Sequence, residues 1–193
     1  MKRLAGLGII LALTLGGTAV LAQDEERGEV GVFADYVRLR HANNTNFWGP
    51  GAQIAFNLND HVQLEAGMSY LPERTFVTTT GTGTTITTTQ TGLRLLQGMF
   101  GPKFQTGVGP VRAFLVLKGG FLNFSVSNRG IGAGFTGAVG NIRDGDTNGV
   151  FYPGVGFEVG RRFGLRAEVG DLMYFDRGAN HNLRVAVGPT FRF

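Results

Sequence analysis

Asn182-Leu-Arg-Val-Ala-Val-Gly-Pro-Thr-Phe-Arg-Phe193 alternates apolar and polar side chains with a period of two residues. Successive side chains of a β-strand point to opposite faces, so this stretch predicts a strand with one apolar and one polar face. The apolar face carries Leu183, Val185, Val187, Phe191 and Phe193, and the polar face carries Asn182, Arg184, Gly188, Thr190 and Arg192. Whether the apolar face contacts lipid or a protein core depends on the cellular location of the chain.

The first 22 residues resemble a secretory leader. Lys2 and Arg3 precede an apolar run from Leu4 to Leu15, and small residues lead to Ala22. This arrangement is typical of a signal peptide, and the apolar run is too short and glycine-rich for a transmembrane helix. We therefore expect a signal peptide over residues 1–22 and an outer-membrane β-barrel domain over residues 23–193, with the apolar strand face meeting lipid.

The composition narrows the class of protein. The chain has 32 glycines and modest charge, which argues against a helical bundle, and it has no cysteine for disulfide staples. Without a later apolar stretch long enough for a helix, entry into a membrane requires closed strands. Loss of the leader removes two of the 18 basic residues and none of the 14 acidic ones, so the net charge falls from +4 to +2. We expect no nucleic-acid partner.

The spacing of alternating segments and turn residues predicts an all-β protein, an eight-stranded antiparallel up-and-down transmembrane β-barrel. Short turns are expected at Asn59-Asp60, residues 107–110 and residues 160–162, and mostly longer connections at 40–47, 73–91, 127–148 and 176–180. Four prolines lie inside expected strands and suggest bulges, bends or strands drawn too long. The expected strands cover residues 28–39, 48–58, 61–72, 92–106, 111–126, 149–159, 163–175 and 181–193.

Aromatic residues suggest two interfacial belts. Phe56, Phe104, Phe157 and Phe191 recur near one end of the even-numbered strands. Aromatic side chains gather at both membrane surfaces of such barrels. A second belt at the other end is expected from Tyr36, Phe47, Trp48, Tyr70, Tyr174 and Phe175.

The leader, the eight alternating strands and the closing Gly188-Pro-Thr-Phe-Arg-Phe193 resemble the small outer-membrane β-barrel family, which includes the OmpA-like transmembrane domain. The resemblance implies a bacterial outer-membrane location, contact with outer-membrane lipids and lipopolysaccharide, and assembly by the barrel-assembly machinery. It also implies that Phe191 and Phe193 form the assembly signal. No peptidoglycan-binding domain is expected after the last strand, so anchoring to the cell wall is not carried over.

The alternation also sends a set of charged side chains into the barrel. An eight-stranded barrel is just wide enough to be filled by its own side chains, so these charges are expected to pair with each other. A gated ion path through them, giving a narrow channel, is the alternative. Met99, Phe114 and Val116 share the inward parity and oppose a channel. The charged set is Asp35, Glu65, Lys103, Arg112, Lys118, Glu158, Arg166, Glu168, Arg184 and Arg192.

Eleven threonines crowd residues 75–91. Threonine is β-branched and favours strands, so the third and fourth strands are expected to continue as a hairpin beyond the membrane surface. A role in adhesion, glycan attachment or receptor binding is the alternative for this segment. The glycine-rich residues 130–140 predict an outer loop.

No metal, cofactor or catalytic site is expected. Asp144-Gly-Asp-Thr-Asn-Gly149 matches the start of a calcium-binding loop, but position twelve is Val155, where glutamate is needed. His41, His61 and His181 lack metal-ligand spacing, although His41 and His181 could meet where the barrel closes. Lipid A deacylases of similar architecture use a histidine and a serine two residues apart, whereas Leu183 follows His181 at that distance.

These inferences predict a barrel that displays its outer loops and plays a structural or surface-interaction role, without enzyme activity, through an unknown extracellular ligand. A soluble lipocalin-like barrel is the remaining rival. It would place the apolar side chains inside and the charges outside.

Overall fold

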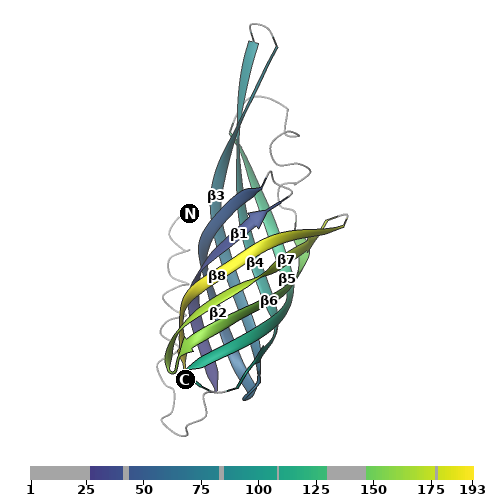
Figure 1. Ribbon diagram of the computed structural model, residues 1–193. Coiled ribbons are helices and arrows are strands. Elements are labelled where there is room, and N and C mark those ends of the chain that lie inside the picture. The colour runs from purple at the N-terminus through teal and green to yellow at the C-terminus, as the bar shows by residue number, and fades with distance from the viewer. Residues whose placement is uncertain (1–26, 41–43, 83–84, 108, 130–146, 177) are drawn as a thin grey trace, which may run out of the picture.

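The computed structural model describes residues 27–40, 44–82, 85–107, 109–129, 147–176 and 178–193, with the backbone alone for residues 76–91 and 127–129. These residues form eight strands that wrap around one axis (Figure 1). The expected signal peptide lies outside the described residues. The strands are β1 (Gly28–Leu39), β2 (Thr45–Asn59), β3 (Val62–Thr82), β4 (Thr85–Gln105), β5 (Val111–Arg129), β6 (Thr147–Gly160), β7 (Phe163–Phe175) and β8 (Ala179–Arg192).

Every strand pairs antiparallel with its neighbours in sequence, and β8 pairs with β1 to close the barrel. At the seam, the Phe193 N–H donates to Gly28 O over 3.0 Å, and Gly28 N–H donates to Phe193 O over 2.9 Å. Closure leaves no open edge within the barrel, so every spanning strand has a partner on each side. The predicted eight-stranded up-and-down barrel is confirmed. Among the described residues, no helix has the length and apolar character to cross a membrane.

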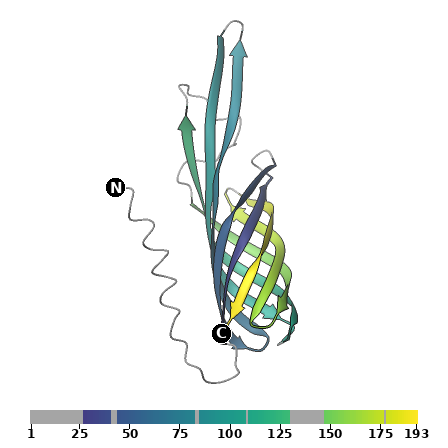
Figure 2. The same cartoon turned by 90° about the vertical axis from the view of Figure 1, so that its left-hand side faces the viewer.

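The two ends of the barrel differ. The connections β2–β3, β4–β5 and β6–β7 are short, and they share one end, the turn end, with the chain's last residue (Figure 1). At the opposite end β3, β4 and part of β5 continue beyond the other strands (Figure 2). A register shift between Leu71 and Arg74 marks where this extension leaves the barrel. The predicted hairpin is confirmed, because residues 74–82 pair with residues 85–93 as strand.

Pro102, Pro153 and Pro189 each pair with a residue of one neighbouring strand and are skipped in the ladder with the other, whereas Pro50 pairs with β1 and lies just before the first pair of the β2–β3 ladder. Pro189 pairs with Leu165 of β7, whereas the β8–β1 ladder skips from Thr190 to Val187 in an unchanged register. Proline has no N–H to donate, so one missing ladder bond is tolerated without a bulge. A neighbouring glycine lets the strands approach at this point: a β-carbon on Gly188 would lie 1.9 Å from Val32 O.

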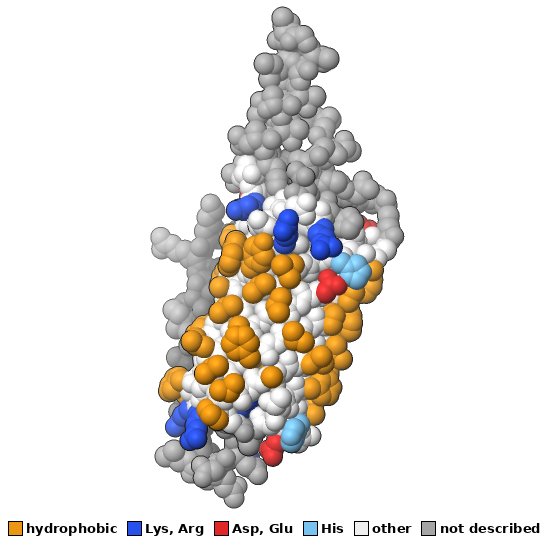
Figure 3. Space-filling view, viewed as in Figure 1, with side chains coloured by type: hydrophobic (Ala, Val, Ile, Leu, Met, Phe, Trp, Pro, Cys, Tyr) orange, Lys and Arg blue, Asp and Glu red, His pale blue; other side chains and the backbone are white. Residues whose placement is uncertain are grey.

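The outer surface of the barrel is apolar. A band of aliphatic and aromatic side chains covers its visible face, and basic side chains gather above and below the band (Figure 3). Val155, Phe157, Leu165 and Val187 each expose between 49% and 63% of their surface. Soluble proteins rarely expose apolar patches of this extent, whereas a membrane-spanning barrel requires them.

Candidate functional site

All ten charged side chains that the alternation sends inward are buried, and none exposes more than 4% of its surface. An eleventh, Glu29, joins them with 1% exposure. Glu29 was not among the predicted residues, although it shares the parity of Asp35 on β1 and the period of two contains the signal for it. These eleven side chains, from every strand except β2, constitute the interior charge network: Glu29, Asp35, Glu65, Lys103, Arg112, Lys118, Glu158, Arg166, Glu168, Arg184 and Arg192.

Arg184 connects the network to the middle of the barrel. Its Nε lies 2.9 Å from Asp35 Oδ1, and its Nη1 lies 3.0 Å from Glu168 Oε1. Asp35 also accepts hydrogen bonds from Ser69 Oγ at 2.5 Å and from Gln97 Nε2. Two partners from β3 and β4 thus hold a carboxylate from β1, which satisfies a charge that is expensive to bury alone.

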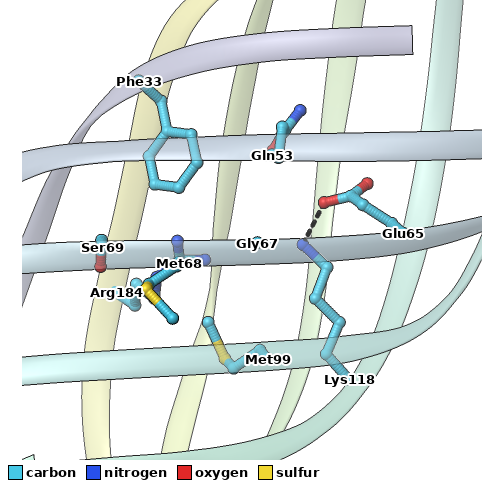
Figure 4. Close-up of a pocket in the computed structure, with 9 residues that line it drawn as sticks. All are labelled: Phe33, Gln53, Glu65, Gly67, Met68, Ser69, Met99, Lys118 and Arg184. Atoms are coloured by element: carbon cyan, nitrogen blue, oxygen red, sulfur yellow. Dashed lines mark hydrogen bonds and ion pairs between the residues drawn. The ribbon is translucent and has the colours of Figure 1, made fainter. Parts of the chain in front are cut away.

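Glu65 forms the centre of the network. Lys118 Nζ donates to Glu65 Oε1 over 2.5 Å (Figure 4). The Arg166 guanidinium reaches both oxygens of Glu65, at 2.7 and 3.2 Å, and also pairs with Glu168. Such a two-point contact matches the fork of arginine to the two oxygens of a carboxylate and fixes its orientation.

A third group closes the network near the turn end. Lys103 Nζ lies 2.6 Å from Glu158 Oε1, and Arg192 bridges Glu158 Oε2 at 2.5 Å and Glu29 Oε2 at 3.0 Å. Arg112 Nε donates to Gly109 O over 3.0 Å. Lys103 Nζ and Arg166 Cζ both lie over the ring of Phe114, 4.7 and 4.4 Å from its centre. The inward aromatic residue thus supports the charges.

Small cavities adjoin these side chains. Two interior cavities of about 10 Å³ each adjoin the network, the first lined by Gln53, Ser69 and Met99 together with charged residues (Figure 4). A volume of this size holds about one water molecule. These two cavities are therefore too small to form a solute path, as expected for eight strands.

The interior is not polar throughout, which corrects the expectation of a packed polar lumen. Toward the extension end its buried side chains are mostly apolar, and two residues assigned to the outer aromatic belt, Phe47 and Tyr174, point inward with 0% and 4% exposure. Their strand neighbours Trp48 and Phe175 take the outward positions. We call this inner group the apolar plug: Val37, Leu39, Phe47, Leu71, Leu93, Leu95, Leu122, Phe124, Val150, Leu172 and Tyr174.

The outer surface carries aromatic side chains at both ends of the barrel. Tyr36 and Trp48 contact each other at the extension end with ring centres 4.7 Å apart. At the turn end, Phe191 packs against Phe163 at 4.9 Å and Phe193 at 6.4 Å. Exposed arginines lie near the extension end of β1, β3 and β4. They are Arg38, Arg40, Arg74 and Arg94.

The described residues contain no group of three or more histidine, cysteine or acidic side chains arranged to hold a metal ion. The calcium-loop residues 144–146 and His41 lie outside the described part of the chain. His181 Nδ1 lies 2.5 Å from Asp171 Oδ2, on the outer surface. Ser69, a serine considered as a nucleophile, instead contacts Asp35 and Gln97.

A closed barrel with a lipid-type exterior and charges sealed inside defines an integral outer-membrane β-barrel. A family model described as the outer membrane protein beta-barrel domain matches residues 8–191. The chain belongs to this family and is a bacterial outer-membrane protein. The soluble lipocalin-like alternative is therefore wrong. No curated protein matches the sequence.

Solved structures of small outer-membrane barrels share the fold. Neisserial surface protein A is 12% identical with a TM-score of 0.58, covering 86% of this chain and 97% of that one. Ail, the attachment invasion locus protein of Yersinia pestis, in complex with the heparin analogue sucrose octasulfate, is 13% identical with a TM-score of 0.51, covering 86% and 97%. The N-terminal barrel of Pseudomonas aeruginosa OprF is 13% identical with a TM-score of 0.50, covering 88% and 100%.

Proposed function

We propose that this protein is a surface-display protein, in which the barrel is the membrane anchor and the extension of β3, β4 and β5 contacts molecules outside the cell. The observation that carries the proposal is strand length. β3 and β4 have 21 residues each and β5 has 19, whereas the other strands have 12 to 15. A membrane crossing needs about 9 to 11 residues per strand, so the excess of β3 and β4 has no role in spanning.

The extension has the geometry of a rigid projection. From Leu71 to Thr82, β3 adds about 35 Å of length at about 3.3 Å per residue. Its backbone is paired with β4 along this length, so the projection is a sheet and holds a defined shape. An ordered projection loses less conformational entropy on binding than a coil. Ail, whose structure contains a heparin analogue, shares the fold and supports a role outside the cell.

The first prediction concerns removal of the projection. Because Thr75 and Gly92 are register partners, an Asn-Gly turn replacing residues 76–91 should close a short hairpin between them. We expect this variant to insert normally and to lose binding to extracellular ligands. Cells displaying the parent and the shortened protein would be compared on arrays of matrix proteins and glycans, with heat-dependent mobility in SDS as the folding control. Equal retention of both on the array, or retention of neither, would contradict the proposal.

The narrow channel remains the alternative function, and the two water-sized cavities give it no support. Catalysis has no support either. The interior acidic groups are paired with cations, and the similar solved structures give no evidence for an enzymatic reaction. We propose no enzyme activity.

We also propose that Phe191 and Phe193 form the signal that the barrel-assembly machinery recognises. In the folded protein the Phe193 ring packs over Gly28 at the seam, where a β-carbon would lie 2.8 Å from the ring. The last residue of the chain thus lies at the junction that closes the barrel. Both rings lie on the outer face of the barrel, where another protein can reach them.

The second prediction tests this signal. Phe193→Ser should reduce the amount of barrel assembled in cells but leave refolding into detergent micelles unchanged. Phe163→Ser removes another exposed ring of the same aromatic cluster and is the matched control. Outer-membrane yield and heat-dependent mobility would be measured for both. An equal reduction for the two variants would indicate a general aromatic contribution and refute a terminal signal.

A further inference from the structure

The apolar plug is a continuous layer across the barrel. Its side chains come from β1 to β7, and none exposes more than 5% of its surface. Leu71, Leu95 and Phe124 are successive register partners on β3, β4 and β5, so they form one row within this layer. The layer lies on the extension side of Asp35 and Arg184, which end the interior charge network. Among the described residues, an ion moving inward from the extension end would therefore reach the plug before the charges.

The eighth strand contributes Asn182, whose polar atoms are satisfied by backbone. Its Nδ2 donates to Leu172 O at 3.1 Å and Asn180 O at 2.9 Å, and its Oδ1 accepts from Arg40 N–H at 3.0 Å. Asn182 thus joins β7, β8 and β1 at the seam without requiring water. It closes the layer where an apolar side chain is missing.

Buried polar atoms without a protein hydrogen-bond partner lie elsewhere. Gln97 Oε1 and the Tyr152 hydroxyl border the plug on its charged side, and Gln63 Oε1, Gln105 Oε1 and Thr190 Oγ1 belong to the part of the interior nearest the turn end. Such atoms are commonly satisfied by buried water. Water therefore has partners in the charged part and, among the described residues, almost none in the plug.

We propose that the apolar plug, and not the interior charge network, is the permeability barrier of this barrel. An ion in the charged part exchanges water for carboxylate or ammonium partners, whereas in the plug it would lose hydration without replacement. Apolar constrictions block conduction by excluding water. The ion pairs stabilise the barrel and determine its interior packing, and they do not gate it.

The third prediction separates the two barriers. Leu71→Ser/Leu95→Ser removes a cross-strand pair from the plug and adds hydroxyls that water can bind. Lys103→Ser/Glu158→Ser removes one ion pair, with an N–O distance of 2.6 Å, from the interior charge network and leaves its net charge unchanged. Each variant, with the parent, would be inserted into planar bilayers, and its ionic conductance would be measured in potassium chloride. We expect current steps for the plug variant alone. Leu95→Ser is the milder variant should the double change prevent folding, which heat-dependent mobility reports.

A thiol provides a second readout, because the chain has no cysteine of its own. Ser69→Cys places one thiol directly beneath the plug, two residues before Leu71 on the same face of β3. Silver ion added from the outside should leave this thiol free in the parent plug and should block it when Leu71 and Leu95 are serine. Free thiol would be counted with a maleimide after unfolding.

Current through the parent, current through the network variant, or silence of the folded plug variant would each overturn the proposal. So would blocking of the Ser69→Cys thiol from outside while the plug is intact. None of these outcomes bears on the display function, which concerns ligand retention by the extension, so the two proposals fail independently.

Discussion

Glu168→Leu is expected to lower strongly the temperature at which the folded barrel unfolds in SDS, while still allowing membrane insertion. Glu168 exposes 3% of its surface and contacts three cations: Arg166, Arg184 at 3.0 Å and Lys118 at 3.4 Å. Removing one partner from a buried ion pair leaves uncompensated charge and costs about 3–5 kcal/mol. The leucine side chain has roughly the volume of glutamate, so the loss of stability would reflect the missing charge more than a change in packing.

The matched control is the double variant Glu168→Leu/Lys118→Met, which removes one acid and one base together. Replacement of a buried pair by apolar side chains is often nearly neutral, so the double variant should recover much of the stability. Heat-dependent mobility and urea unfolding in lipid vesicles would measure both. A single variant as stable as the parent would show that Glu168 is not held as a paired, buried carboxylate.

Val169→Arg is expected to prevent most of the protein from folding into a bilayer. Val169 is adjacent to Glu168 in sequence but points to the opposite face of β7. Val169 lies at the middle of β7 with 42% exposure on the outer face. An arginine on the lipid face at the bilayer midplane costs about 2–4 kcal/mol in such barrels, a large part of a typical folding free energy. The measurement is the folded fraction in phosphatidylcholine vesicles across a urea series.

The control is the same substitution at an outward-facing site close to the membrane surface. Leu58 is 65% exposed but lies at the turn end of β2, one residue before the turn. Near an interface the same substitution costs only about 0–1 kcal/mol, so Leu58→Arg should fold almost normally. If both variants folded equally well, the apolar band would not be facing hydrocarbon.

Much of this molecule follows from local sequence rules. The alternation on β7 and β8 assigned Glu168 and Arg184 to one face and Val169 and Val187 to the other, and their exposure agrees with it. Local rules suffice here because the side-chain period of a strand is two, whatever the strand pairs with. The bounds of β1 and β7 were predicted to the residue for the same reason.

The sequence determined the alternating strands, the face that carries the charges and the aromatic belt residues at the strand ends, since each of these is a property of neighbouring positions. Only the tertiary structure decided that Phe47 and Tyr174 point inward, because Phe47-Trp48 and Tyr174-Phe175 are apolar at both parities. It also decided the partner of each charge: Asp35 and Arg184 are 149 residues apart and meet only when β8 closes on β1. Closure and register are long-range properties, and they placed an apolar layer above the charges.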